Sequence, residues 1–426
     1  MIKGRSSGRM AAMAGRNRSE RVLILASFVN RVGNGLFNTA SALYFTLVVG
    51  LPAVQVGAAL TVAGLIGLLA GIPGGHLADR RGPRTIMMLA LAVQALAMSA
   101  LVLVESWAGL TVIATVDQLA AAAGGAAWGA LVVRVGTDRP ALFRAKLRTY
   151  VNLGVVLGTV GAGFAVAADS RTAYTVLILG NAASFALCAL LLFLLPPYEA
   201  LAAPAAPQER RWIALTDRPF VAFTVLYGAM GLQYATVSLI LPIWISEHTD
   251  APRWTVAAVS AINSAVCVVL QTRIGSRIET LRDGGRAFRT AGLLFLLSCP
   301  LMALTAHAPV WAAAGLAVVA IFVHSLGEIW ESSACFALGF GLAPDHAQGQ
   351  YQGLLGIGFS AGQALAPAIL TTVVLGAGTA GWLLLGVFFA AVGATGPSLE
   401  RWGTRTRARE GAAVAEPSRK PDEAHA

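Results

Sequence analysis

The chain has 426 residues, of which 56% are hydrophobic and only 12% are charged. A soluble globular domain carries roughly 25% charged residues, so this chain has too few polar side chains to cover a surface that faces water. Its net charge of +10 lies in short basic clusters between long apolar runs. That distribution excludes a folded nucleic-acid-binding face and is typical of a protein embedded in a lipid bilayer.

Twelve apolar runs reach the roughly 20 residues that a helix needs to cross a bilayer. The sequence therefore predicts an all-α membrane protein with twelve transmembrane helices in two pseudo-symmetric six-helix bundles. The predicted spans are residues 22–49, 54–78, 85–104, 108–133, 148–168 and 173–195 in the first half, and 220–246, 254–274, 288–306, 309–333, 350–374 and 377–397 in the second.

The segments outside these spans predict the domain organisation. Residues 1–21 form a basic N-terminal segment, and the Pro- and charge-rich residues 196–218 read as a cytoplasmic linker. The linker separates an N-terminal bundle, residues 22–195, from a C-terminal bundle, residues 219–397. Residues 398–426 are charged and poor in aromatic side chains, so we expect a disordered cytoplasmic tail.

The basic residues predict the orientation of the chain. With a cytoplasmic N-terminus, 28 of the 31 Lys and Arg residues fall on the cytoplasmic side, and only Arg171 and Arg253 fall on the other. This asymmetry predicts that both termini lie in the cytoplasm, for a multi-pass protein of a bacterial inner (plasma) membrane. The first apolar run is too long for a signal peptide, so we expect it to be retained.

The four cysteines lie inside apolar runs without metal-ligand or redox spacing, which indicates packing residues. They are Cys188, Cys267, Cys299 and Cys335. The sequence accordingly predicts no metal and no cofactor. It also lacks a G-x-x-x-x-G-K-[ST] nucleotide-binding signature, so the expectation is that an ion gradient supplies the energy or that transport is passive.

A run of glycines and charged residues lies at the end of the second predicted span. Residues 75–84 match the pattern G-x-L-a-D-r-x-G-r-r at Gly75, Leu77, Asp79, Arg80, Gly82 and Arg84, whereas Pro83 stands where the pattern has a base. This signature and the twelve spans resemble the major facilitator superfamily of secondary transporters. The resemblance implies that Asp79 latches the two halves together, with Arg80 and Arg84 as its local partners. The alternative is that these arginines only anchor the topology.

Two further features resemble the twelve-helix drug/proton antiporter branch of that superfamily. Glycines line the fifth span at positions 154, 158, 161 and 163, and the runs Gly327-Glu328 and Gly362–Pro367 lie in the tenth and eleventh spans. The Gly-Pro pair of the branch is absent, and the fourth span carries Asp117 in place of an arginine. The resemblance implies a monomer that binds a small-molecule substrate and uses protons as the coupling ion.

Charged residues inside the predicted spans are candidates for proton coupling. Arg31 and Asp117 both lie roughly 14 Å deep at 1.5 Å per residue, near the middle of a bilayer core. We therefore expect an Arg31–Asp117 ion pair or a shared polar pocket, which serves either coupling or static packing. His324, Glu328 and Glu331 share one face of the tenth span; Glu328 is a second candidate proton carrier with His324, and Glu331 is expected at the membrane interface.

Uncharged polar side chains suggest where a substrate cavity lies. Asn30, Asn34 and Asn38 follow one face of the first span at helical spacing, which fits either a cavity wall or helix packing. The other cavity candidates are Trp128, Tyr227, Gln233, Tyr234, Asn263 and Gln363.

These observations predict a secondary active transporter that works by alternating access. The favoured activity is proton-coupled efflux of small amphipathic organic molecules or drugs, and the alternative is a proton-coupled symporter that imports a metabolite. A membrane enzyme is disfavoured, because an H-E-x-x-H signature is absent and the two G-x-S-x-G matches lie in the basic N-terminal segment, residues 4–8, and inside the eleventh predicted span, residues 358–362, rather than at a strand-to-helix turn. A transporter-like receptor would differ by not needing the Asp79 latch.

Overall fold

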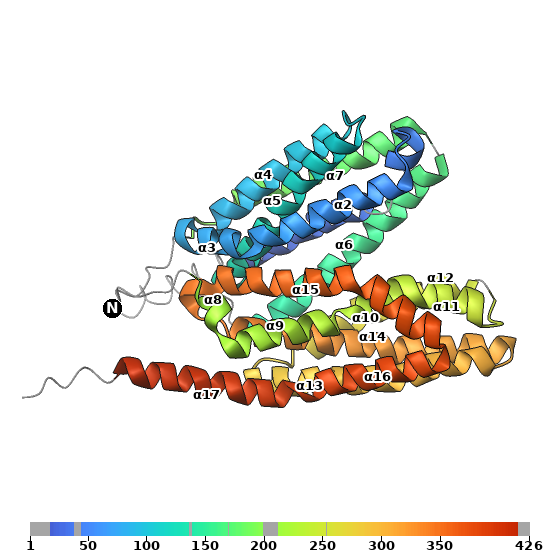
Figure 1. Cartoon of the computed structure of the whole chain (residues 1–426). Helices are drawn as coiled ribbons and strands as arrows, with labels where there is room; N and C mark the ends of the chain where they lie inside the picture. The colour runs from blue at the N-terminus through green and yellow to red at the C-terminus, as the bar shows by residue number, and fades with distance from the viewer. Residues whose placement is uncertain are drawn as a thin grey trace, which may run out of the picture.

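The computed structural model describes residues 18–37, 44–135, 139–168, 170–198, 212–252 and 254–415, and within them it contains helices and no strand. Residues 18–37 form the first helix (Figure 1). The α-helices that follow are α2 (Ala53–Gly67), α3 (Gly71–Arg81), α4 (Pro83–Leu101), α5 (Trp107–Arg134), α6 (Pro140–Ala168), α7 (Arg171–Leu192), α8 (Ile213–Thr216), α9 (Arg218–Met230), α10 (Leu232–Ala235), α11 (Leu241–His248), α12 (Trp254–Gly275), α13 (Leu281–Leu304), α14 (Val310–Gly341), α15 (Gln348–Leu370), α16 (Thr379–Ala394) and α17 (Gly396–Ala415). Short 3-10 or π segments lie at Tyr44–Val48, Leu68–Ala70, Thr236–Ile240, Thr305–His307, Asp345–Ala347 and Thr371–Leu375.

Ten continuous helical stretches in the described part of the chain are long and apolar enough to cross a membrane. Each coincides with one of the twelve predicted spans. The first predicted span runs through residues 38–43, which lie outside the described residues, and the fifth lies within α6. The all-α prediction is therefore confirmed.

Polar side chains start several of these helices by capping their free N–H groups. Ser106 accepts from the Gly109 N–H before α5, and Ser170 accepts from the Ala173 N–H before α7. Thr280 and Asp283 form a reciprocal capping box at the start of α13. These caps set where the chain turns at the ends of neighbouring helices.

The helices gather into two groups, each around its own apolar core. Figure 1 shows α2, α4, α5 and α7 together above α9, α13, α14 and α16. The first core contains Tyr44, Phe45, Phe143, Tyr174 and Phe185. The second contains Phe220, Phe288, Phe295, Phe389 and Trp382.

Two helices, α15 and α6, connect the two groups. α15 packs against α3 and α5 as well as against α9, and α6 packs against α12 and α14. The contacts between α3 and α15 lie where α3 ends and α15 begins, at the left in Figure 1. We call this the basic end, because Arg80, Arg81 and Arg84 lie at the junction of α3 and α4.

The seventh span is irregular where it approaches the middle of the protein. α9 ends at Met230, and a π segment, Thr236–Ile240, separates α10 from α11. Gln363 on α15 donates to the Gly231 carbonyl at 3.0 Å, because a carbonyl freed by a helix break needs a partner in an apolar setting. This break holds α10, and with it Tyr234, at the seam between the groups, where Tyr234 meets Arg148 of α6.

The predicted disorder of the C-terminal tail is not what the structure shows for residues 398–415. α17 continues to Ala415 and packs against α13. Its Arg407 donates to the Leu342 carbonyl at the end of α14 and pairs with Asp217, the residue that caps α9. The charged composition was misleading because these tertiary contacts order the segment; residues 416–426 lie outside the described residues.

Candidate functional site

Asp79 joins the two helix groups at the basic end. Its carboxylate accepts hydrogen bonds from the backbone N–H groups of Gly349, at 2.8 Å, and Gln350, at 3.1 Å. These are free N–H groups in the first turn of α15, where the helix dipole favours a negative charge. Asp79 is 8% exposed. The acid predicted to act as a latch thus caps a helix of the opposite group.

Glycines allow α3 and α15 to approach this closely. A Cβ on Gly75 would overlap the carbonyl of Gly349, and a Cβ on Gly353 would overlap the carbonyl of Gly71. Gly82 has φ of 89°, a region that disfavours side chains, and directly precedes Pro83 at the first position of α4. Pro83 therefore fits the turn in place of the base that the signature carries.

The arginines of the signature do not pair with Asp79 in the way the resemblance implied. Arg84 donates to the carbonyls of Leu192 and Phe193 at the C-terminal end of α7, at 2.9 and 3.2 Å. A cation at a helix C-terminus satisfies carbonyls that lack helical partners. Arg80 is exposed. The cation that acts electrostatically on Asp79 is Arg134 of α5.

A second connection between the groups lies inside the protein and centres on Arg148 of α6. Its Nη2 lies 3.8 Å from Oε1 of Glu328 on α14 and donates to the Tyr234 hydroxyl at 2.8 Å. Asn263 of α12 donates to the other Glu328 oxygen at 3.1 Å and to Ser325 at 3.0 Å. The side chains of Arg148 and Glu328 are 24% and 11% exposed, so the pair lies next to open space.

Glu331 extends this network into the core. It accepts from the Tyr234 hydroxyl at 3.1 Å and from the Cys335 thiol at 3.2 Å. Glu331 is fully buried, so the prediction that it reaches the membrane interface is wrong. Tyr234 therefore connects Arg148 to Glu331, and we call Arg148, Tyr234, Asn263, Glu328 and Glu331 the central network.

The predicted Arg31–Asp117 ion pair is not formed among the described residues. Asp117 accepts from Gln94 of α4 at 3.3 Å. Arg31 instead lies close enough to Arg148 for the two cations to repel each other. The first helix contacts α6 through Gly154 and Gly158, and this packing turns Arg31 towards α6 rather than towards α5.

His324 and Gln233 lie apart from the central network. His324 contacts Ser298 at 3.3 Å through Nδ1 and Gln233 at 3.2 Å through Nε2, and its ring packs on Phe295. Both His324 and Gln233 are buried. The helical spacing that placed His324 on the face of Glu328 did not resolve which helix lies on each side of α14.

The other cavity candidates occupy several places. Asn34 donates to Asn30 at 3.0 Å, and Trp128 of α5 donates to Ser27 at 3.1 Å, which ties α5 to the first helix. Tyr227 stacks on Phe359, whose ring also lies against Tyr234. Asn38 lies outside the described residues.

Arg148 is the residue that the sequence reasoning missed. It was counted with the cytoplasmic cations because the fifth span was predicted to begin at residue 148. α6 begins at Pro140 instead, so Arg148 lies about 12 Å further along it at 1.5 Å per residue. A proline at the first position of a helix is a start signal, and it could have revealed that Arg148 lies inside.

Comparison with known proteins identifies the fold. The sequence profile described as Major Facilitator Superfamily matches residues 23–367. The chain belongs to this superfamily. It is therefore a membrane transporter and not an enzyme. Over 326 residues it is 26% identical to multidrug resistance protein MdtH of Shigella dysenteriae. The matched stretch covers 74% of this chain and 76% of that protein.

Solved structures of major facilitator transporters share the fold at low identity. FucP in its outward conformation matches with a TM-score of 0.69 and 15% identity, over 90% of this chain and 98% of that one. A bacterial homologue of the iron transporter ferroportin matches at 0.68 and 14%, over 91% and 99%. The human organic anion transporter MFSD10 matches at 0.65 and 16%, over 89% and 98%. At these identities the likeness concerns the fold alone.

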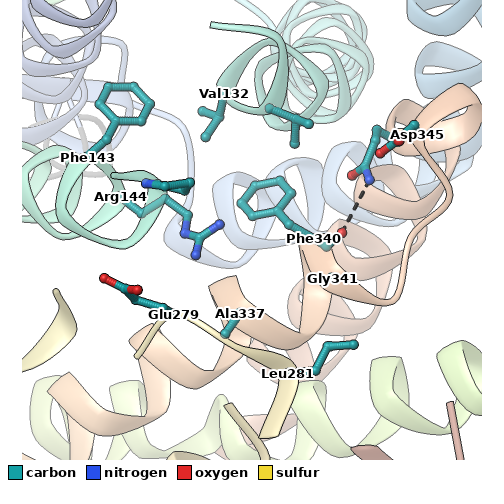
Figure 2. A pocket seen from close by; sticks show the side chains of 12 residues that line it. Val132, Phe143, Arg144, Glu279, Leu281, Ala337, Phe340, Gly341 and Asp345 are labelled. Carbon is teal, nitrogen blue, oxygen red and sulfur yellow. Dashed lines mark hydrogen bonds between the residues drawn. The ribbon is translucent and has the colours of Figure 1, made fainter. Parts of the chain in front are cut away.

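This superfamily member also has a cavity of about 440 Å³ at the basic end, away from the central network. Figure 2 shows Arg144 of α6 reaching towards Phe340 of α14, with Glu279 facing it from the other side. Asp345 and Leu281 complete the side formed by the second helix group. Within the described residues no group of three or more His, Cys, Asp or Glu side chains could hold a metal ion.

Proposed function

We propose that this transporter is proton-coupled and works by alternating access between the bundles of residues 22–195 and 219–397, with the basic end in the cytoplasm. One observation carries the proposal: the Arg148–Glu328 ion pair joins the two bundles inside the protein at 3.8 Å. An ion pair across a moving seam has to open when the bundles separate there. A carboxylate that loses its cation in an apolar setting binds a proton more readily.

The closed basic end supports the same cycle. Asp79 caps α15 across the seam, and the proposal assigns Gly75, Asp79 and Gly82 to a cytoplasmic gate. When this gate opens, α15 moves away from α3, and the N–H groups of Gly349 and Gln350 become free. Because α15 also packs on α9, its movement can reach α10 and Tyr234 in the central network.

Efflux of small amphipathic organic molecules is the direction that the likeness to a multidrug resistance protein favours. The aromatic side chains of Tyr227, Phe359 and Tyr234 offer an apolar wall beside the charged network, as in binding sites for mixed apolar and polar ligands. A symporter that takes up a small metabolite is the second candidate, and the observation that favours it is the pair of neighbouring cations Arg31 and Arg148.

Transport into inside-out vesicles energised by respiration tests the proposal. A panel of cationic dyes and antibiotics, together with carboxylate analogues, is offered to the wild type, Glu328→Gln and Asp117→Asn. We expect uptake of at least one compound to collapse with the pH gradient. Glu328→Gln should lose this dependence while it still exchanges substrate.

Asp117→Asn serves as the comparison, since Asp117 accepts its hydrogen bond from a neutral Gln94 within one bundle. Loss of coupling in Asp117→Asn but not in Glu328→Gln would move the proton site to α5. Transport that ignores the pH gradient in the wild type would reject proton coupling altogether.

A further inference from the structure

Two arginines share the interior of this protein, but only one of them has a carboxylate partner. Arg148 pairs with Glu328 and reaches Glu331 through Tyr234. No carboxylate forms an ion pair with Arg31 within the described residues, and the charge that acts on Arg31 is the like charge of Arg148. An arginine inside a membrane protein is costly unless it has an anionic or polar partner or contacts water.

The backbone packing explains why Arg31 lies there. A Cβ on Gly154 would lie 3.0 Å from the Cβ of Arg31 and 2.8 Å from the Phe28 carbonyl. The first helix is therefore pressed onto α6 at Arg31, between one and two turns from Arg148. Any side chain at position 154 would push the two arginines apart.

Arg31 is surrounded by protein atoms, yet a large part of its surface remains accessible. An exposed guanidinium at this depth cannot face hydrocarbon, so it faces the space between the bundles. Arg148, which lies next to it, already contacts the opposite bundle through Glu328 and Tyr234. The two guanidinium groups thus border the same space.

The uncharged groups around this space suit an organic ligand. On the first helix, Asn34 and Asn30 hydrogen-bond to each other and offer further amide donors. On the opposite bundle, Tyr227 and Phe359 stack at 5.4 Å between ring centroids. A molecule with an apolar or aromatic body and one anionic group would match both surfaces.

We propose that Arg31 and Arg148 together bind an anionic group of the transported molecule, so that the substrate is a small organic anion. This inference rests on the proposed function, because it assigns a ligand to the same central space. A guanidinium presents paired donors that match a carboxylate or phosphate oxygen pair. Arg31 supplies the charge that is not already neutralised, and Arg148 supplies a charge that Glu328 can release.

Three probes built on one ring test the inference: 2-naphthoate, 2-naphthamide and 2-naphthylmethylammonium. They differ in charge and hardly at all in shape. Binding to the purified full-length protein in lipid vesicles is followed by quenching of its tryptophan fluorescence, with chloride as an inorganic competitor. Arg31→Gln removes the free charge, Arg31→Lys restores it, and Arg81→Gln is the control, since Arg81 is exposed at the basic end.

We expect the wild type to bind the carboxylate more tightly than the amide or the ammonium compound. Arg31→Gln should weaken carboxylate binding roughly ten- to hundredfold, as for a lost hydrogen bond to a charged group. Arg31→Lys should recover part of the loss, and Arg81→Gln should change nothing. If Arg31→Gln folds poorly, the relative affinities of the wild type for the three probes still test the inference.

The inference is overturned if the amide or the ammonium compound binds as tightly as the carboxylate, or if the carboxylate does not bind up to its solubility limit. Chloride that competes as strongly as naphthoate would reject the organic part of the ligand. The proposed function and this inference can fail separately. Carboxylate binding at Arg31 without any proton-driven transport would reject the proposed function but not the anion site. Proton-driven transport without a preference for carboxylates would reject only the substrate class.

Discussion

Asp79 connects residues 270 positions apart in the sequence, and it does so through backbone N–H groups rather than through an arginine. The partner does not depend on side-chain identity, since every non-proline residue at the start of α15 offers the same donor. A carboxylate in this position gains from both hydrogen bonds and the helix dipole. Arg80 and Arg84 are free to serve other purposes, and Arg84 does so at the end of α7.

Asp79→Asn should weaken the closed state of the basic end. The amide keeps one acceptor but loses the charge, which costs about 1–2 kcal/mol and shifts the open-to-closed ratio roughly five- to thirtyfold. Spin labels on the exposed residues Lys146 and Arg277 straddle the seam between α6 and α12. Their distance distribution should gain a longer component. Arg81→Gln is the control, and an unchanged distribution in Asp79→Asn would contradict the role of Asp79 as a latch.

At the scale of helices, close approach depends on glycines that face each other. α3 meets α15 through Gly71 and Gly353, and the first helix meets α6 through Gly35 and Gly158. Small residues allow backbones in a membrane to pack at short range where no hydrophobic force drives the helices together. Gly154 and Gly158 of the fifth span therefore have a packing role in this structure, whatever else their pattern resembles.

Two substitutions on α15 separate this packing from helix propensity. Gly353→Ala places a methyl group against the Gly71 carbonyl, whereas Gly356→Ala meets no atom within 4 Å. Both gain about 1 kcal/mol of helix propensity. We expect Gly353→Ala to lower the unfolding temperature and lengthen the Lys146–Arg277 label distance, and Gly356→Ala to be neutral or slightly stabilising. Equal behaviour of the two variants would contradict a close α3–α15 contact.

One side chain of α17, Arg407, connects this helix to several others of the second bundle. Arg407 donates to the Leu342 carbonyl and pairs with Asp217, and Tyr351 donates to the same carboxylate at 2.8 Å. These contacts join α17 to the ends of α14 and α9 and to α15.

Arg407→Ala should therefore reduce the free energy of unfolding by about 1–2 kcal/mol, since Asp217 and the Leu342 carbonyl each lose a donor. Arg409→Ala is the matched control, because Arg409 is exposed on the same helix. Thermal unfolding in detergent measures both variants. Equal unfolding temperatures for Arg407→Ala and the control would show that α17 is held by its apolar contacts alone.

At the scale of the whole molecule, ten of the twelve predicted spans coincide, in the predicted order, with long apolar helices of the described residues, because a span in lipid needs a long apolar run. The sequence predicted the Asp79 contact because a short motif carries it. It could not place Arg148 or Glu331, since burial of a charged residue depends on which helices surround it. Helical spacing put His324 and Glu328 on one face, yet Ser298 and Asn263, from different helices, are their respective neighbours.

The sign of the coupling between proton and substrate follows from the competition of the substrate and Glu328 for Arg148. If an anionic substrate takes Arg148 from Glu328, that carboxylate loses its cation and binds a proton more readily. Anion and proton then favour each other's binding, as reciprocal linkage requires. Anion affinity should therefore rise as pH falls. The anion and the proton should cross the membrane in the same direction. An exporter of cations needs the opposite sign, because substrate and proton would then compete for Glu328.

Binding of 2-naphthoate measured between pH 5 and pH 8, a range of about three units in which buried carboxylates titrate, distinguishes these cases. We expect wild-type affinity to increase towards low pH, and Glu328→Gln to bind tightly at every pH, because its side chain no longer competes for Arg148. Asp117→Asn should keep the wild-type dependence, since Asp117 contacts Gln94 and not Arg148. Wild-type affinity that decreases towards low pH would instead support exchange of substrate against protons, and with it the efflux direction.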